Sequence, residues 1–182
     1  MKKPLLALAL GLSAGLAGTS AFATTGTIFF EGKITANTCP IDIVNPGDGS
    51  VGNVVRMGDL EASRFTGTGQ ELAEWRFVLR VKDGASCGLT PTSKANVTFN
   101  GTPDPTGSYF AVTPTADGAK GVVIVLKDKT GNPVAPGAAS NDYALNDTGP
   151  TDMEFKAYYR STAATVSAGV ASADVQFVVA IN

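Results

Sequence analysis

Apolar and polar side chains alternate along several short segments of this chain, and this two-residue period is the feature that most constrains its fold. Residues 75–81 are typical: the alternation predicts a half-buried strand with Trp75, Phe77, Leu79 and Val81 on one face. Further strands are expected at residues 97–99, 122–126 and 155–162, and residues 62–74 are expected to form a loop with at most one helical turn. The 3.6-residue period of an amphipathic helix is almost absent. The sequence therefore predicts an all-β sandwich with irregular connections.

Both ends of the chain carry an alternating apolar row. The row near the N-terminus consists of Ile28, Phe30, Gly32 and Ile34, and the row at the C-terminus consists of Val175, Phe177, Val179 and Ile181. A strand that runs to the end of a chain leaves its backbone groups and its apolar row to be covered by something else. Either the N-terminal segment of the same chain or another chain is therefore expected to cover the C-terminal row.

The first residues have the pattern of an export signal. Lys2 and Lys3 precede an apolar run, residues 5–17, and an A-x-A cleavage pattern follows at residues 21–23. Residues 1–23 are therefore expected to be a signal peptide, and its removal leaves 159 residues. No later run reaches the length of a membrane helix. We expect the mature chain to be exported.

Composition excludes several classes of function. The chain has no His, so it cannot form a Ser-His-Asp or Cys-His catalytic set or a His-liganded zinc site. Without the two lysines of the leader, 12 basic and 16 acidic side chains remain, a net charge of −4 with no basic cluster, which disfavours binding of nucleic acid. Asp152 and Glu154 share one strand face, and we interpret them as solvated surface charges rather than an acid and a base. The spacing of the aspartates does not fit a Ca²⁺ loop. We therefore expect neither catalysis nor a metal or cofactor.

Cys39 and Cys87 are the only cysteines. In an exported protein, an even pair indicates a disulfide rather than a metal site or a nucleophile. The bond would close a loop of about 48 residues, which the chain-entropy model values at about 4 kcal/mol before strain is subtracted. We expect it to be structural.

The two end patterns and the segments between them occur in an order found in one family. The segments are residues 28–34, Cys39, residues 57–60, residues 77–80 leading to Cys87, residues 97–101, 120–124 and 155–159, Gly169 as the fourteenth residue from the end, and the terminal alternating strand. In this order and in both end patterns the chain resembles the chaperone-usher fimbrial subunits, in particular the major pilin of type 1-like fimbriae. It departs from the family at Ile181, where a penultimate Tyr is usual, and an Ile there keeps the apolar contact but loses the hydroxyl group.

The resemblance implies an incomplete immunoglobulin-like sandwich, the pilin fold, completed by a donor strand from a neighbouring subunit or a chaperone. Residues 24–34 would be the N-terminal donor-strand extension, with Ile28, Phe30, Gly32 and Ile34 facing the groove, and residues 35–182 would be the pilin domain. The groove would lie along the terminal strand, marked by Gly169, Val175, Phe177, Val179 and Ile181. The implied partners are identical or related pilin subunits in a head-to-tail polymer, a periplasmic pilus chaperone and an outer-membrane usher. The implied location is a fimbria on the cell surface, reached through the periplasm, where it supports adhesion.

Two alternatives remain at this point. A minor or tip-adaptor pilin would have the same single-domain plan. A secreted carbohydrate-binding sandwich, closed by its own N-terminal strand, would instead use Trp75 with Tyr158 and Tyr159 as a platform for sugar rings. We expect Trp75 to lie in the core, because it shares a strand face with Phe77 and Leu79.

Overall fold

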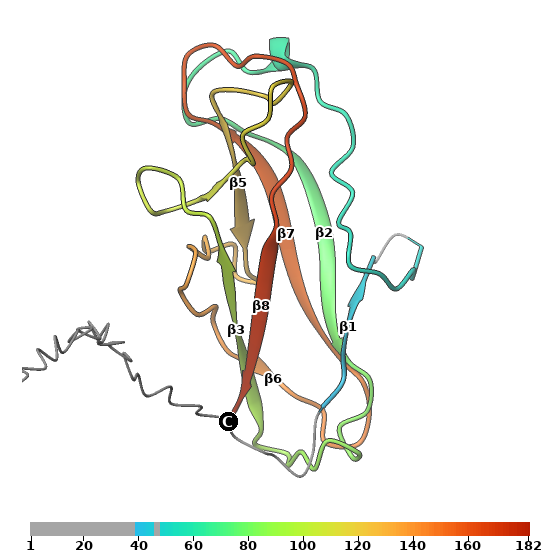
Figure 1. The fold of residues 1–182 in the computed structure, drawn as a ribbon. Helices are drawn as coiled ribbons and strands as arrows, with labels where there is room; N and C mark the ends of the chain where they lie inside the picture. The colour runs from blue at the N-terminus through green and yellow to red at the C-terminus, as the bar shows by residue number, and fades with distance from the viewer. Residues whose placement is uncertain (1–38, 46–47) are drawn as a thin grey trace, which may run out of the picture. The chain divides into compact units, whose positions relative to one another are not determined.

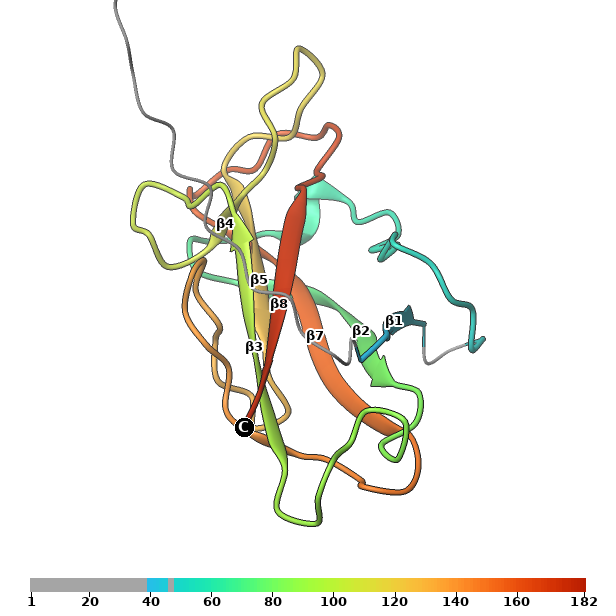
Figure 2. The same ribbon diagram turned by 60° about the horizontal axis from the view of Figure 1, so that its bottom comes forward.

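The alternating segments form two antiparallel β-sheets in the computed structural model, which describes residues 39–45 and 48–182 (Figures 1 and 2). The first sheet has the strand order β1-β2-β7-β5-β4, and the second has the order β6-β3-β8. The strands of the first sheet are β1 (Ile41–Val44), β2 (Glu71–Val81), β7 (Thr151–Ser161), β5 (Val122–Lys127) and β4 (Phe110–Ala111). Those of the second are β6 (Tyr143–Ala144), β3 (Lys94–Gly101) and β8 (Val175–Ile181). All described residues belong to one compact unit, Thr35–Asn182.

Aromatic rings from both sheets fill the space between them. The ring centroid of Phe155 on β7 lies 4.9 Å from that of Phe99 on β3 and 5.3 Å from that of Tyr143 on β6. Phe77 of β2 stacks on Phe155 at 5.6 Å. Such pairs contribute about 0.5–1.5 kcal/mol each beyond the area they bury. This cluster therefore holds the two sheets together.

Ion pairs cover the outer face of the first sheet. Arg80 of β2 pairs with Asp152 of β7 at 2.5 Å, and the guanidinium group holds the pKa of Asp152 below its usual range. Glu154 lies 3.6 Å from Arg76 on the same face. Both carboxylates are thus paired surface charges. The same face carries the pairs Lys82–Asp42, Lys156–Glu74, Lys127–Glu71 and Arg160–Glu71.

The predicted strands are present, with shifted ends. The strand expected at 122–126 is β5, and the one expected from 155 begins four residues earlier, at Thr151. The helical turn expected within 62–74 is η1 (Ala62–Arg64), a 3₁₀ helix, and β2 already begins at Glu71. Within the part of the chain that the structure describes, no helix is long and apolar enough to cross a membrane.

The predicted disulfide is present. The sulfur atoms of Cys39 and Cys87 are bonded, and the Cα atoms lie 5.0 Å apart. Cys39 comes just before β1, and Cys87 lies in the turns after β2. The bond therefore ties the edge strand of the first sheet to the connection between the two sheets.

Candidate functional site

The last strand, β8, forms an open edge of the second sheet. It pairs with β3 from Ala95↔Ile181 to Gly101↔Val175, and no other described strand pairs with it. Reciprocal backbone hydrogen bonds between Asn182 and Lys94 hold its end in place, at 2.8 and 3.0 Å. The strand is thus fixed on one side and leaves a row of backbone groups free on the other.

A second stretch of chain with free backbone groups lies along the first sheet. After the bridge between Val44 and Val51, the amide of Gly52 donates to the carbonyl of Ile43 at 3.0 Å. Beyond Gly52, the backbone groups of residues 53–60 form no hydrogen bond with another described residue. This stretch, which we call the 53–60 wall, runs from the end of β1 towards η1 (Figure 1).

An apolar groove of about 830 Å³ separates β8 from the 53–60 wall. Its lining from the wall includes Val54, Val55 and Met57, and its lining from the other side includes the segment 171–177. Core side chains of both sheets also line it: Phe77, Leu79, Ile124, Leu126, Ala157 and Tyr159 of the first sheet, and Phe99 of the second. The groove thus opens the hydrophobic core along the free edge of β8.

The side chains of β8 alternate as the sequence predicts. Val175, Phe177 and Val179 are half-buried, whereas Gln176, Val178 and Ala180 are exposed. Val175 and Phe177 line the groove directly, and Val179 follows them on the same face. Ile181, opposite Ala95, is 38% exposed at the far end of the strand. The other half of the predicted site, Ile28, Phe30, Gly32 and Ile34, lies outside the described residues, as do the leader 1–23 and the whole segment 24–34.

Gly169 lies before β8 and does not line the groove. A Cβ atom there would lie 2.5 Å from the backbone nitrogen of Ala119 and from the carbonyl oxygen of Asp117. The next residue, Val170, exchanges backbone hydrogen bonds of 2.9 Å with Asp117 and Ala119. Gly169 thus allows two loops to pack closely where the chain enters the segment that leads to β8.

Tyr159 of β7 supports one end of the groove. Its hydroxyl group donates to the carbonyl of Ala171 at 3.2 Å, and its ring is among the lining side chains. Burial raises the pKa of this hydroxyl above its ordinary value. The contact links the first sheet to the residues just before β8, and no sequence pattern predicted this role for Tyr159.

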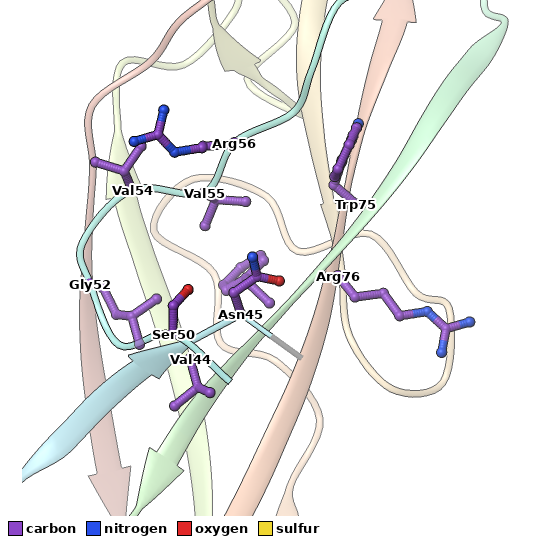
Figure 3. A pocket seen from close by; sticks show the side chains of 11 residues that line it. Val44, Asn45, Ser50, Gly52, Val54, Val55, Arg56, Trp75 and Arg76 are labelled. Carbon is purple, nitrogen blue, oxygen red and sulfur yellow. The ribbon is translucent and has the colours of Figure 1, made fainter. Parts of the chain in front are cut away.

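The expected burial of Trp75 is wrong. Trp75 shares the inner face of β2 with Phe77, as expected, and stands opposite the buried Ala157, but it is 39% exposed. Its side chain lines a pocket of about 60 Å³ together with Val54, Val55 and Arg56 of the 53–60 wall (Figure 3). The wall approaches the indole through Gly58, where a Cβ atom would be 2.7 Å from Trp75 Cζ2. The wall, rather than the second sheet, thus covers this side chain in part.

Trp75, Tyr158 and Tyr159 do not form one platform. Tyr159 faces the core, whereas Tyr158 lies on the outer face of the first sheet, where its hydroxyl donates to Glu74 at 2.5 Å. This hydrogen bond, together with those from Arg76 and Lys156, lowers the pKa of Glu74 to about 2. Burial together with Glu74 raises the pKa of Tyr158 to about 12. The ammonium group of Lys127 lies 5.0 Å from the centre of the Tyr158 ring. A ring that a cation already occupies is not a free stacking surface.

Gly58→Ala should destabilise the folded protein. Gly58 has a left-handed φ of 63°, and the added methyl group would meet the indole of Trp75 at 2.7 Å. We expect a loss of about 1–3 kcal/mol in the free energy of unfolding, as for other overpacked sites. Gly52→Ala is the matched control in the same connection, because its Cβ would have no atom within 4 Å. Denaturant unfolding measures both variants, and equal midpoints for the two would contradict the contact.

The comparisons with known proteins agree with this geometry. The family model described as "Fimbrial protein" matches residues 28–182. The chain belongs to this fimbrial protein family. The fimbrial chain is 34% identical to the probable major fimbrial subunit LpfA of Escherichia coli O157:H7, over 97% of this chain and 95% of that protein. It is 31% identical to fimbrial subunit type 1 of Salmonella typhimurium, over 84% of this chain and 80% of that protein.

Solved structures show the same fold. An antigen and type I fimbria protein of Burkholderia pseudomallei superposes with a TM-score of 0.56 at 32% identity, covering 80% of this chain and 90% of that one. The P pilus rod subunit PapA superposes with a TM-score of 0.57 at 17% identity, covering 72% and 93%. The fimbrial chain therefore has a pilin-type β-sandwich. It is a structural subunit of an extracellular surface fimbria and not an enzyme.

Proposed function

We propose that this subunit polymerises by donating a strand: residues 24–34 of one copy occupy the groove beside β8 of the next. The observation that carries the proposal is the open edge of β8 above an apolar groove lined by core side chains. An added strand would satisfy backbone groups on β8 and on the 53–60 wall at once. Strand addition of this kind derives affinity from backbone hydrogen bonds and specificity from alternate side chains.

The sequence of the donor segment fits such a groove. Ile28, Phe30 and Ile34 form one apolar row, and burial contributes about 1.5–3 kcal/mol for each side chain. Each backbone hydrogen bond adds about 0.5–1.5 kcal/mol. Gly32 interrupts the row and suits a point where the groove has no room for a side chain. The large apolar contact makes the assembled state much more stable than the open subunit.

The geometry of the contact leads to a fibre. The donor lies at one end of the chain and the groove lies in the pilin domain, residues 35–182, so the two surfaces differ. A contact between two different surfaces is head-to-tail and propagates without closing. Identical or related subunits are therefore the partners in the fibre.

Before assembly, the open groove requires temporary cover. We propose that the signal peptide, residues 1–23, directs export to the periplasm. A pilus chaperone would cover β8 there with a strand of its own, and an outer-membrane usher would pass the subunit to the growing fibre. The support is the large apolar groove, since an exposed apolar edge strand promotes aggregation.

Deleting residues 24–33 tests the proposal. The full chain should yield multimers from the cell surface that resist SDS until boiled, because each groove holds a strand of its neighbour. The deleted subunit should fold and bind chaperone but form no multimers alone. A self-closed monomer behaves differently: the full chain would stay monomeric, and the deletion would lower its free energy of unfolding. Multimers from the deleted protein alone would also contradict the proposal.

A further inference from the structure

The residues just before β8 form one bank of the groove without belonging to a strand. Residues 171–174, which we call the strap, line the groove, and β8 begins only at Val175. Figure 1 shows this segment entering β8 from a loop at one end of the sandwich. Apart from Asp174, its side chains are those of Ala and Ser. The width of the groove here therefore depends on where the backbone of the strap lies, because no large side chain of the strap fills the space.

Two hydrogen bonds from different segments hold the strap. The amide of Thr113, in the connection after β4, donates to the carbonyl of Ser172 at 2.8 Å. The hydroxyl group of Tyr159 on β7 donates to the carbonyl of Ala171 at 3.2 Å. Both ends of the strap are fixed, at Val170 by backbone hydrogen bonds to a neighbouring loop and at β8 by its pairing with β3. The ladder between β3 and β8 does not include the strap, so its own position depends on these two contacts.

The side chain of Tyr159 lies between the strap and the opposite bank. Tyr159 is only 8% exposed, and its ring lines the groove. Burial and, to a smaller extent, the negative charge of Asp59 raise the pKa of its hydroxyl group. Asp59 belongs to the 53–60 wall. The hydroxyl group is thus close to both banks, but it donates its proton to the strap.

We propose that Tyr159 is a positioning residue: its hydroxyl group holds the strap away from the 53–60 wall and so keeps this end of the groove open. The inference rests on the proposed strand donation for the identity of what enters the groove. It deepens that proposal by naming a residue that prepares the groove before it is filled.

The strap would move towards the wall if this hydroxyl group were absent. Core side chains such as Phe99, Ile124 and Leu126 line the groove, and the removal of apolar surface from water favours closure. Without its donor, the carbonyl of Ala171 would face an apolar floor with no partner, which is unfavourable. Movement of the strap relieves both. Loss of one hydrogen bond shifts such an equilibrium by roughly fivefold to tenfold.

A strand bound in the groove makes the hydroxyl group dispensable. Such a strand packs against the strap from inside and brings backbone N–H groups of its own. It therefore holds the strap in the open position whether or not Tyr159 can donate. Tyr159 should thus affect how fast the groove is filled and not how firmly the occupant is held.

A cysteine pair across the groove reports the position of the strap. A groove that admits one strand has banks roughly 10 Å apart, twice the spacing of paired strands, which exceeds the reach of a disulfide. Met57→Cys with Ala173→Cys places one thiol on the wall and one on the strap. In newly made full-length chain, peptide mass measurement should find several-fold more of this bond in the Tyr159→Phe background. Tyr158→Phe is the matched control, because it removes a hydroxyl group from the outer face, and it should leave the bond as rare as in the unchanged chain.

Assembly provides a second readout, which distinguishes positioning from a purely structural role. Without the added cysteines, Tyr159→Phe should slow the appearance of SDS-resistant multimers several-fold, and Tyr158→Phe should not. The temperature at which finished fibres dissociate in SDS should be the same for both variants and the unchanged chain. A hydroxyl group that only stabilised the fold would lower this temperature and leave the rate of assembly unchanged.

The outcomes separate this inference from strand donation. Equal bonding across the groove with and without the Tyr159 hydroxyl group, or an equal rate of multimer formation, would overturn the role of Tyr159 and leave strand donation intact. If the unchanged chain forms no SDS-resistant multimers while Tyr159→Phe still promotes the bond across the groove, strand donation fails and the role of Tyr159 stands.

Discussion

Phe177→Asp should abolish incorporation of the subunit into fibres. Phe177 is half-buried, lines the groove and stands opposite Phe99 in the register of β3 and β8. A donor strand would bury this position completely, and an unpaired buried carboxylate is strongly unfavourable. Loss of a buried Phe side chain alone costs about 3–5 kcal/mol. Fibre yield on the cell surface measures the effect.

Ala180→Asp is the matched control for this variant. Ala180 belongs to the same strand but is exposed on its outer face. The carboxylate there stays in water, so fibres should form at close to the normal yield. Normal yield from Phe177→Asp would refute the assignment of the groove to the inner face of β8.

Gly32→Val should block polymerisation while leaving the subunit folded. In the proposed fibre, Gly32 of one copy passes over a point where the groove of the next copy has no room, and a β-branched side chain would meet packed atoms. Even modest overpacking costs about 1–3 kcal/mol. The donor segment is not part of its own subunit's sandwich in this mechanism, so the free energy of unfolding of the chaperone-bound subunit should not change.

Thr25→Val provides the control for Gly32→Val. Residue 25 lies in the small polar stretch 24–27 before the apolar row, so a valine there adds a similar side chain outside the pockets. Assembly assays and unfolding of the chaperone complex should be run on both variants. A Gly32→Val subunit that is destabilised in isolation would favour the self-closed sandwich.

Most strands of this fold could be predicted from the sequence, because apolar and polar side chains alternate along a strand whose sheet has one buried face. The alternation predicts β2 and β3, whereas β5 is predicted by its continuous apolar run, and the inward residues of β8 agree with the alternation. The disulfide followed from export and an even number of cysteines. These features are local or compositional, so one sequence is enough to find them.

The wall of the groove could not be predicted in the same way. Residues 53–60 lack regular alternation and make no backbone hydrogen bonds to other described residues, so neither a strand nor a turn pattern marks them. The partial exposure of Trp75 could not be predicted either. Alternation gives the face to which a side chain points, but how far the opposite sheet extends over that face depends on packing between distant segments.

The burial of two carboxylates in turns could not be predicted from the sequence either. Asp128 is only 2% exposed, and one of its oxygens accepts hydrogen bonds from the amide and the hydroxyl of Thr130 and from the amide of Asn132. Asp104 is 5% exposed and accepts from Thr106 in a similar way. Both belong to connections between strands, and a side chain that folds back onto its own loop leaves no periodic signal in the sequence.

Mixed fibres test strand donation most directly. A tagged subunit that lacks residues 24–33 can accept a strand but cannot donate one, so it should terminate any fibre that it joins. When it is expressed together with the full chain, the mean fibre length should fall as its share rises. Immunogold electron microscopy should then find at most one tagged subunit in each fibre, at an end. Tagged subunits distributed along the length of the fibres would contradict strand donation.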